Sequence, residues 1–249
     1  MRILGHRGGA GSRYPENSIP AFRFGADAGA DVLELDVRLT RDGHVVVAHD
    51  AVIDRVSSGS GAISGLTARE LRSTPLRDPG GKTQPGIVMP LLEEVFDAVP
   101  DQALNIDLKT AEPRLADAVL RSVTVAAAER RVTIASFIPT ALDYFRSQAP
   151  HIASSAHPGE VRTALEAWLG TKNLQTPAKR FQIPQHHGPI PLSLPGFIRF
   201  LHGHGFAVDY WTINRPAALQ RLYRRGADGV VTDDVHWAVS EMEHLHEYN

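Results

Sequence analysis

The stretch Val32-Leu33-Glu34-Leu35-Asp36-Val37 decides the fold expected of this chain. Its apolar positions are all Val or Leu, which is typical of a strand in a parallel sheet that is buried on both faces. Glu34 and Asp36 lie two positions apart, so their side chains point to the same face of the strand. The stretch therefore predicts a parallel sheet with two carboxylates held inside the protein.

Similar apolar runs recur along the 249 residues, with helix-favouring segments between most of them. The runs that predict strands are 2–5, 32–37, 45–48, 104–108, 132–136, 152–155, 181–183, 206–212 and 229–232. Segments 114–130, 140–148, 160–169 and 216–225 are rich in Ala, Leu, Glu and Arg, which favour helices. This alternation predicts an α/β fold, and the length fits a single TIM-type (β/α)8 barrel domain over residues 1–249.

Two features depart from a simple barrel. The expected strands number one more than eight, so one of them should be accessory, and 152–155 and 181–183 are the weakest. Strands 32–37 and 45–48 are joined by only seven residues, which include the turn signal Asp42-Gly43. A crossover between parallel strands needs about a dozen residues, so this connection is either a hairpin or an irregular return loop.

Residues 50–89 are dense in Gly, Ser, Pro and Arg and predict a loop-rich insertion after the third strand. Within it, Thr67 and Glu70 have the spacing of a capping box that opens a short helix. An insertion of this length is either a lid or binding loop, or tolerated surface.

The composition excludes several classes of protein. Lys and Arg number 26 against 28 Asp and Glu, a formal net charge of −2, so no nucleic-acid partner is expected. The absence of cysteine excludes disulfides and thiolate metal sites. No apolar run is long enough to predict a transmembrane helix and no signal peptide is evident, so we expect a cytoplasmic protein without stable membrane insertion. The oligomeric state stays open.

Histidines end two of the predicted strands. His6 ends the first strand and is followed by Arg7-Gly8-Gly9, and His49 ends the third. Two histidines at strand ends can supply a general acid and a general base near neutral pH. Arg7 supplies a planar cation suited to a phosphate, and the two glycines permit a tight turn with N–H groups open to an anion.

A second strand carries polar residues in the same alternating pattern. In Asn105-Ile106-Asp107-Leu108-Lys109, the polar side chains share one face. Polar residues near the carboxyl ends of barrel strands converge on one mouth. Carboxylates gathered there require a divalent cation or, alternatively, ion pairs with Arg38 or Lys109. The combined pattern describes a metal-assisted hydrolase of a phosphate ester.

The chain also resembles the glycerophosphodiester phosphodiesterases. The resemblance rests on stretches that run in family order along nearly the whole chain: 6–9, 15–18, 34–37, 40–43, 46–50, 54–55, 61, 67, 70–71, 90–95, 105–109, 136–137, 211–214 and 226–233. Only 156–185 looks unlike the family. The resemblance implies a TIM-type barrel in which the insertion shapes the substrate entrance.

The resemblance also implies a set of site residues. It assigns His6 and His49 to acid–base catalysis, and Arg7, Lys109 and Trp211 to the phosphate and the substrate pocket. It assigns Glu34, Asp36 and Asp107 to a divalent cation, Mg²⁺ or Ca²⁺, with Mn²⁺ also compatible. Asp107 departs from the family, which usually has Glu there, and its reach is shorter by about 1.5 Å.

These residues predict hydrolysis of glycerophosphodiesters, a small-molecule substrate class, to sn-glycerol 3-phosphate and an alcohol. One alternative is a barrel phosphodiesterase that acts on lysophospholipids or sphingolipids. Another is a catalytically inactive barrel that only binds phosphorylated ligands, although the full set of histidines and carboxylates argues against it.

Overall fold

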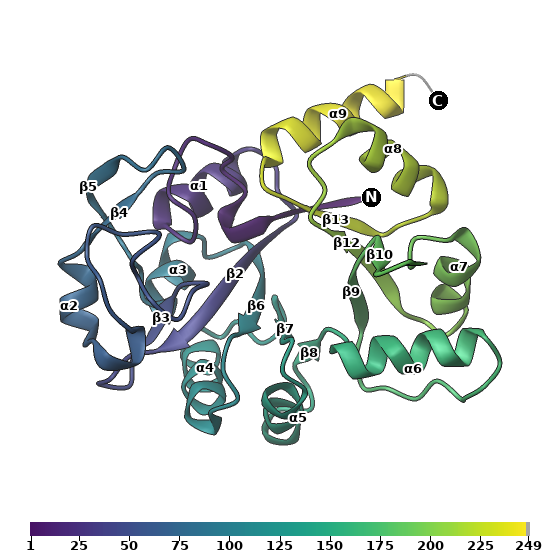
Figure 1. Cartoon of the computed structure of the whole chain (residues 1–249), viewed down its shortest axis with the longest axis horizontal. Helices are drawn as coiled ribbons and strands as arrows, with labels where there is room; N and C mark the ends of the chain where they lie inside the picture. The colour runs from purple at the N-terminus through teal and green to yellow at the C-terminus, as the bar shows by residue number, and fades with distance from the viewer. Residues whose placement is uncertain (248–249) are drawn as a thin grey trace.

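Eight parallel strands form a nearly closed barrel in the computed structural model, which describes residues 1–247 (Figure 1). Neighbours in space follow the order β8-β7-β6-β2-β1-β13-β12-β9. In chain order these strands are β1 (Arg2–Gly5), β2 (Val32–Leu39), β6 (Ala103–Leu108), β7 (Val132–Ala135), β8 (Ala153–Ser154), β9 (Arg180–Pro184), β12 (Ala207–Trp211) and β13 (Gly229–Thr232). A parallel bridge between Ser155 and Arg180 joins β8 to β9. The predicted TIM-type barrel is confirmed, and residues 248–249 of the expected domain lie outside the described residues.

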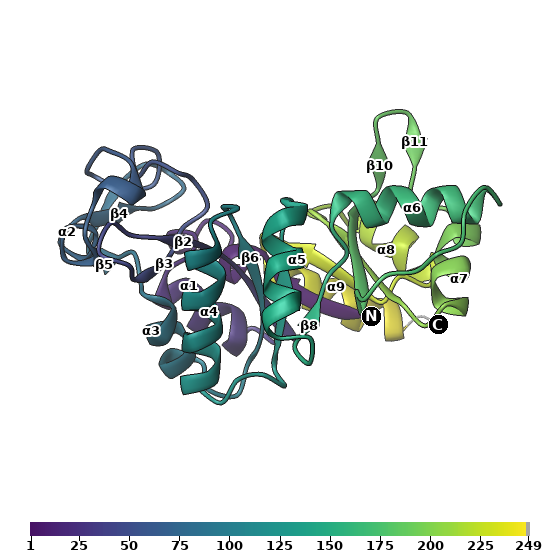
Figure 2. The same ribbon diagram turned by 90° about the horizontal axis from the view of Figure 1, so that it is seen from below.

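Helices surround the barrel, and one follows each barrel strand (Figures 1 and 2). They are α1 (Ile19–Asp27), α3 (Leu92–Ala98), α4 (Pro113–Val125), α5 (Pro139–Gln148), α6 (Pro158–Trp168), α7 (Pro195–Gly203), α8 (Pro216–Arg225) and α9 (Val235–Glu247). Proline occupies one of the first two positions of six of them. Its fixed φ suits a helix start, and its missing N–H has no intrahelical partner to lose there. No helix within residues 1–247 is long and apolar enough to cross a membrane.

The accessory strand is β3 (Val45–Val47), which pairs antiparallel with β2. The residues that join them form a tight turn, in which Gly43 has a φ of 86°, so the connection is a hairpin. The expectation that the accessory strand is 152–155 or 181–183 is wrong, because β8 and β9 both belong to the barrel. β8 has only two residues, and β9 alternates polar with apolar residues, so neither has a strong local apolar signal.

The predicted insertion folds as a compact unit beside the barrel, at the left of Figure 1. It contains α2 (Ala68–Arg72) and the antiparallel pair β4 (Pro75–Arg77) and β5 (Thr83–Val88). The capping box at α2 is confirmed, since Glu70 N donates to Thr67 Oγ1 and Thr67 N donates to Glu70. Buried apolar side chains of the insertion, among them Ile53, Ile63 and Leu71, form one core with Val46 of β3 and with Ala48. The insertion is therefore anchored on the β3 segment by apolar packing.

The barrel interior differs from the shell around it. The main apolar core lies between the strands and the helices, whereas the interior holds a small apolar cluster of Leu4, Val32 and Val231. Asp209, fully buried on β12, lies 3.2 Å from Arg180 and 3.5 Å from Arg2. A second group of buried polar side chains stands on β2 and β6, where the candidate site lies.

Candidate active site

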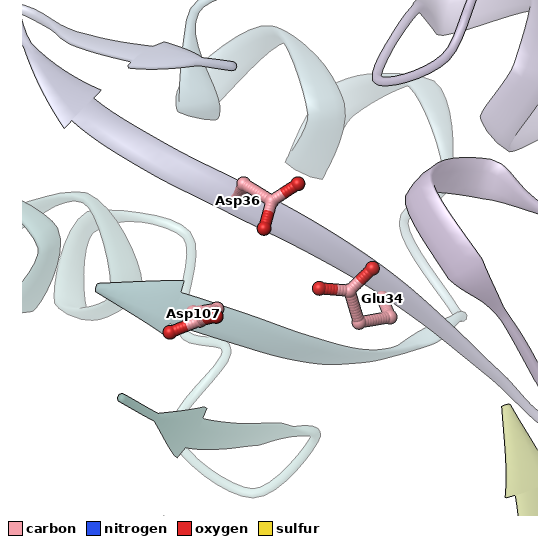
Figure 3. Close-up of side chains that lie close together, drawn as sticks. All are labelled: Glu34, Asp36 and Asp107. Atoms are coloured by element: carbon pink, nitrogen blue, oxygen red, sulfur yellow. The ribbon is translucent and has the colours of Figure 1, made fainter. Parts of the chain in front are cut away.

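The three predicted metal-binding carboxylates lie together on two neighbouring barrel strands (Figure 3). Glu34 and Asp36 project from β2 and Asp107 from β6, and one oxygen of each lies within 4.8 Å of the others. The two strands are parallel neighbours, with Asp36 opposite Asp107. All three residues are at most 8% exposed. Three carboxylates this close and this buried repel one another, so they require positive charge between them.

The local charges act differently on the three groups. Burial and the charge of Asp36 raise the pKa of Glu34 to about 8. Burial also raises the pKa of Asp107, although Lys109 counteracts it. For Asp36, burial opposes ionisation, but Lys109 and a hydrogen bond from Asn17 outweigh it and lower the pKa. The cluster is therefore only partly neutralised by the side chains around it.

Lys109 supplies part of the missing charge. Its Nζ lies 2.7 Å from Asp36 Oδ1 and 2.7 Å from Asp107 Oδ2. Of the two ion pairs left open by the sequence, the one with Lys109 is present. The alternative with Arg38 is wrong, because the Arg38 guanidinium donates to the backbone carbonyl of His49 at 2.9 and 2.7 Å.

Two buried oxygens of the cluster have no hydrogen-bond partner within the described chain. They are Asp107 Oδ1 and Asn105 Oδ1, and Asn105 stands opposite Glu34 in the strand register. Leaving a buried acceptor unpaired is costly. Oxygen atoms of this kind are the ligands preferred by hard divalent cations. The donor set therefore fits Mg²⁺, Mn²⁺ or Ca²⁺.

His6 follows β1 directly and pairs with a residue from the other end of the chain. Its Nδ1 lies 2.6 Å from Asp233 Oδ1, and Asn214 Nδ2 donates to the second Asp233 oxygen at 2.5 Å. Burial would lower the pKa of His6, but the bond to Asp233 and the charge of Glu34 outweigh it and raise the pKa. Because a carboxylate only accepts hydrogen bonds, Nδ1 carries the proton and Nε2 is left for proton transfer.

The turn after His6 positions Arg7. The φ of Arg7 is 50°, and its backbone N–H donates to Glu34 at 2.9 Å. Its guanidinium lies 2.9 Å from Glu16 through Nη1 and 3.4 Å from Asp36 through Nε. The expectation that glycine N–H groups here face an anion is wrong for Gly9, whose N–H donates to the His6 carbonyl at 2.8 Å.

His49 reaches the site because β3 runs back along β2. Ala48 N donates to the Asp36 carbonyl at 2.9 Å, which brings the following residue beside the carboxylates. His49 Nδ1 lies 2.8 Å from Asp50 Oδ1, and Arg55 donates to the other Asp50 oxygen at 2.6 Å. Burial opposes ionisation of Asp50, but these two partners lower its pKa to about 2. The His49 ring is thus paired with a carboxylate, as His6 is.

Trp211 ends β12, and its ring contacts the ring of Phe137. The two ring centres are 5.6 Å apart with an edge-to-face arrangement, and Trp211 Nε1 donates to the Gln182 carbonyl at 2.9 Å. Phe137 is 58% exposed, and Lys109 Nζ lies 6.0 Å from its ring centre. An aromatic pair therefore stands beside Lys109, and this places Trp211 near the carboxylate cluster.

The structure adds polar residues to which the sequence assigned no role. They are Glu16, Asn17, Asp50, Arg55 and Asp233. All of them lie in stretches that resemble the family, which is a signal that they matter. Local sequence does not reveal which side chains they contact, because most of their partners come from other segments.

Comparisons with known sequences and structures all point to one family. The model of the glycerophosphoryl diester phosphodiesterase family matches residues 6–236. A glycerophosphodiester phosphodiesterase of Caldanaerobacter subterraneus subsp. tengcongensis is 30% identical over 93% of each chain. A putative glycerophosphoryl diester phosphodiesterase structure from Silicibacter pomeroyi superposes with a TM-score of 0.83 and 24% identity, over 99% of this chain and 94% of the other. An Oleispira antarctica phosphodiesterase, solved in complex with the product sn-glycerol-3-phosphate, has a TM-score of 0.78 and 22% identity over 98% and 97% of the two chains.

Proposed function

The chain belongs to the glycerophosphoryl diester phosphodiesterase family, and from this membership we propose that it hydrolyses glycerophosphodiesters to sn-glycerol 3-phosphate and an alcohol. One observation carries the proposal: two histidines, each paired with a carboxylate, stand on segments that flank a buried carboxylate cluster. This combination suits cleavage of a phosphate diester, since the reaction needs two proton transfers and stabilisation of negative charge.

In this proposal His6 and His49 perform the two proton transfers. Nε2 of one ring accepts the proton of the attacking hydroxyl group as its oxygen bonds to phosphorus. Nε2 of the other ring donates a proton to the alcohol oxygen that leaves when its own P–O ester bond breaks. The carboxylates of Asp233 and Asp50 fix the tautomers and stabilise each ring while it is protonated.

Arg7 and Lys109 bind the phosphate oxygens, and Trp211 lines the pocket. The guanidinium of Arg7 and the ammonium of Lys109 both lie against Asp36, so their charges are close to the cluster. Their positive charge attracts the diester and stabilises the additional negative charge that develops during the reaction.

Glu34, Asp36 and Asp107 would hold a divalent cation. Support comes from Asp107 Oδ1, a buried acceptor that has no partner among the described residues, and from the raised pKa of Glu34. Ionising Glu34 needs positive charge that the described side chains do not supply. When bound, the cation supplies electrostatic stabilisation of the phosphate.

A second candidate substrate class is the lysophospholipids. The exposed ring of Phe137 packs on Trp211 beside Lys109, and this apolar surface would suit a substrate with an acyl chain. The observation that favours this class is that Lys109, the proposed phosphate-binding residue, lies next to the exposed ring of Phe137.

A substrate panel tests both candidates. Glycerophosphocholine, glycerophosphoethanolamine and lysophosphatidylcholine would each be incubated with Mg²⁺, Mn²⁺ or Ca²⁺, and with chelator alone. A coupled dehydrogenase detects glycerol 3-phosphate, and mass spectrometry detects lysophosphatidic acid. Glycerol 3-phosphate release with a cation supports the main proposal. Release of lysophosphatidic acid alone supports the second candidate, and absence of turnover on every substrate would contradict both.

A further inference from the structure

We propose that Arg55 is a positioning residue that holds both sides of the reaction site, His49 through Asp50 and Arg7 through Glu16. We call Glu16, Asp50 and Arg55 the Arg55 clamp. This inference rests on the proposed function, and it gives the insertion a specific role. The insertion supplies the Arg55 guanidinium, which fixes the carboxylates of Asp50 and Glu16. These carboxylates in turn contact His49 and Arg7.

The contacts of Arg55 divide between the two carboxylates. Its Nε donates to Asp50 Oδ2 at 2.6 Å, while Nη1 and Nη2 donate to the two oxygens of Glu16 at 3.0 and 2.7 Å. One bond further, Asp50 Oδ1 lies 2.8 Å from His49 Nδ1. Glu16 Oε1 likewise accepts from Arg7 Nη1 at 2.9 Å. A continuous chain of polar contacts thus joins His49 to Arg7 through the Arg55 clamp.

Only arginine can make this set of contacts. The guanidinium is planar and presents its Nε and two Nη groups in a fixed fork, so it can bind two carboxylates at once. A lysine ammonium is a point charge on a flexible chain, and it would satisfy one of the carboxylates at a time. The residue type at position 55 is therefore matched to its two partners.

The Arg55 clamp has a different consequence on each side. Asp50 can orient the His49 ring only if Asp50 itself is fixed, and its second oxygen is fixed by Arg55. We therefore expect this side to affect proton transfer, and hence kcat. Glu16 lies between two guanidinium groups, those of Arg55 and Arg7. Glu16 can hold the Arg7 guanidinium in place only if Glu16 itself is fixed, and Arg55 binds both of its oxygens. Loss of Glu16 or of Arg55 should therefore free the Arg7 side chain and weaken its hold on the phosphate, which should raise KM.

We expect the fold to tolerate loss of the Arg55 side chain. Arg55 is 52% exposed, and exposed ion pairs contribute little to stability. Ile53, two residues earlier, is buried in the core of the insertion and anchors the backbone there. Substitutions at position 55 should therefore leave a folded protein whose kinetics can be measured.

The test compares Arg55→Ala with its two partner variants on the glycerophosphodiester that the wild-type enzyme cleaves best. Glu16→Gln should raise KM about tenfold with kcat within about twofold, and Asp50→Asn should lower kcat about tenfold with KM within about twofold. Arg55→Ala should do both. Arg77→Ala is the matched control, since Arg77 lies in the same insertion and its side chain donates to the Asp54 carbonyl, away from both carboxylates.

The double variants decide whether the three residues act together. Adding Arg55→Ala to Glu16→Gln should produce little further rise in KM, and adding it to Asp50→Asn should produce little further fall in kcat. Arg55→Lys should recover one parameter more than the other, because it binds one carboxylate. Thermal midpoints of all variants should stay within about 2 °C of the wild type, because an exposed ion pair contributes little to stability.

Several results would overturn the inference. They are an Arg55→Ala enzyme within twofold of wild type in both parameters, effects that multiply independently in the double variants, or an equal loss in Arg77→Ala. A wild-type enzyme without activity on the substrate panel would instead contradict the proposed function.

Discussion

His6 and His49 resemble each other in their pairing but differ in their surroundings. Each presents Nδ1 to a carboxylate, Asp233 for His6 and Asp50 for His49. The side chain of His6 is 23% exposed and that of His49 is 36% exposed. Both rings are thus oriented by hydrogen bonds and accessible enough to exchange protons with a substrate or with solvent.

Replacing either histidine by alanine should therefore abolish most of the turnover. We expect His6→Ala and His49→Ala each to lower kcat by roughly 100-fold or more, the scale of general acid–base catalysis. His151→Ala serves as the control and should retain full activity, because His151 is exposed and precedes β8, at the opposite, amino-terminal end of the barrel strands. Steady-state kinetics check the prediction. If a variant kept more than half of the wild-type kcat/KM, the histidine that it lacks would not be catalytic.

Asp107 stands where the family usually has Glu, and its shorter side chain should determine which cation binds best. Mg²⁺ requires about 2.0–2.1 Å and near-octahedral geometry but readily keeps water ligands, whereas Ca²⁺ accepts about 2.3–2.6 Å and irregular geometry. A ligand that reaches less far leaves room for a water molecule, so we expect Mg²⁺ or Mn²⁺ to restore activity best after chelation.

Substitution at Asp107 tests this through binding as well as activity. Asp107→Ala should lower the cation affinity by at least about tenfold in isothermal titration calorimetry and remove most of the activity. Asp107→Glu should stay active with an altered order of preference among Mg²⁺, Mn²⁺ and Ca²⁺. Unchanged cation affinity in Asp107→Ala would leave Asp107 as a partner of Lys109 alone.

At the level of elements, the turn between β1 and α1 is constrained by packing. Gly9 has a φ of 67°, and a Cβ there would lie 2.4 Å from Val235 Cγ2 and 2.7 Å from the Gly5 Cα. This turn directly follows His6 and Arg7, whose side chains lie at the candidate site. The glycine is therefore required by space as well as by backbone conformation.

Gly9→Ala should destabilise the protein by about 2–4 kcal/mol, since the positive φ and the overpacking both contribute. Gly188→Ala is a matched control, because Gly188 also has a positive φ, 57°, but no atom within 4 Å of the added Cβ. It should cost only about 1 kcal/mol. Urea unfolding measures the free energy of unfolding of both variants. Equal losses would contradict the prediction, because the structure would then adjust to the added Cβ at position 9 without a cost.

For the whole molecule, the buried carboxylates couple stability to pH and to cation binding. Burial and Asp36 raise the pKa of Glu34 from an ordinary 4.5 to about 8. The folded protein then binds the Glu34 proton more tightly than the unfolded chain, so stability falls as the pH rises from about 4.5 to 8. The raised pKa of His6 acts in the same direction, because its contribution is also lost as the pH rises.

We expect the cation-free protein to lose stability between about pH 6 and 8, on the order of 2–4 kcal/mol. Saturating Mg²⁺ should flatten this dependence, because the cation replaces the proton on the cluster. Glu34→Gln should flatten it without any cation. Thermal or urea unfolding at a series of pH values checks this, and an identical slope in chelator, in Mg²⁺ and in Glu34→Gln would contradict it.

Features that depend on local pattern could be predicted from the amino-acid sequence. Alternating apolar and helix-favouring runs predicted the barrel, and the period of two within 32–37 placed Glu34 and Asp36 on one face. The capping box at Thr67 and Glu70 was also predictable, because both of its partners lie within one helical turn. Resemblance to a family added candidate roles for His6 and His49, which remain predictions.

Contacts between distant residues depend on the tertiary structure. Closure of the barrel brings Asp233 onto His6 across 227 positions of sequence, and the insertion brings Arg55 onto Glu16 across 39. The same closure makes β8 and β9 barrel strands although their local signal is weak, and it leaves β3 as the accessory strand. Strand register and the packing of the insertion set these contacts, and both depend on pairing between segments far apart in the chain. Local periodicity indicates which face a side chain occupies, but not which side chain will stand opposite it.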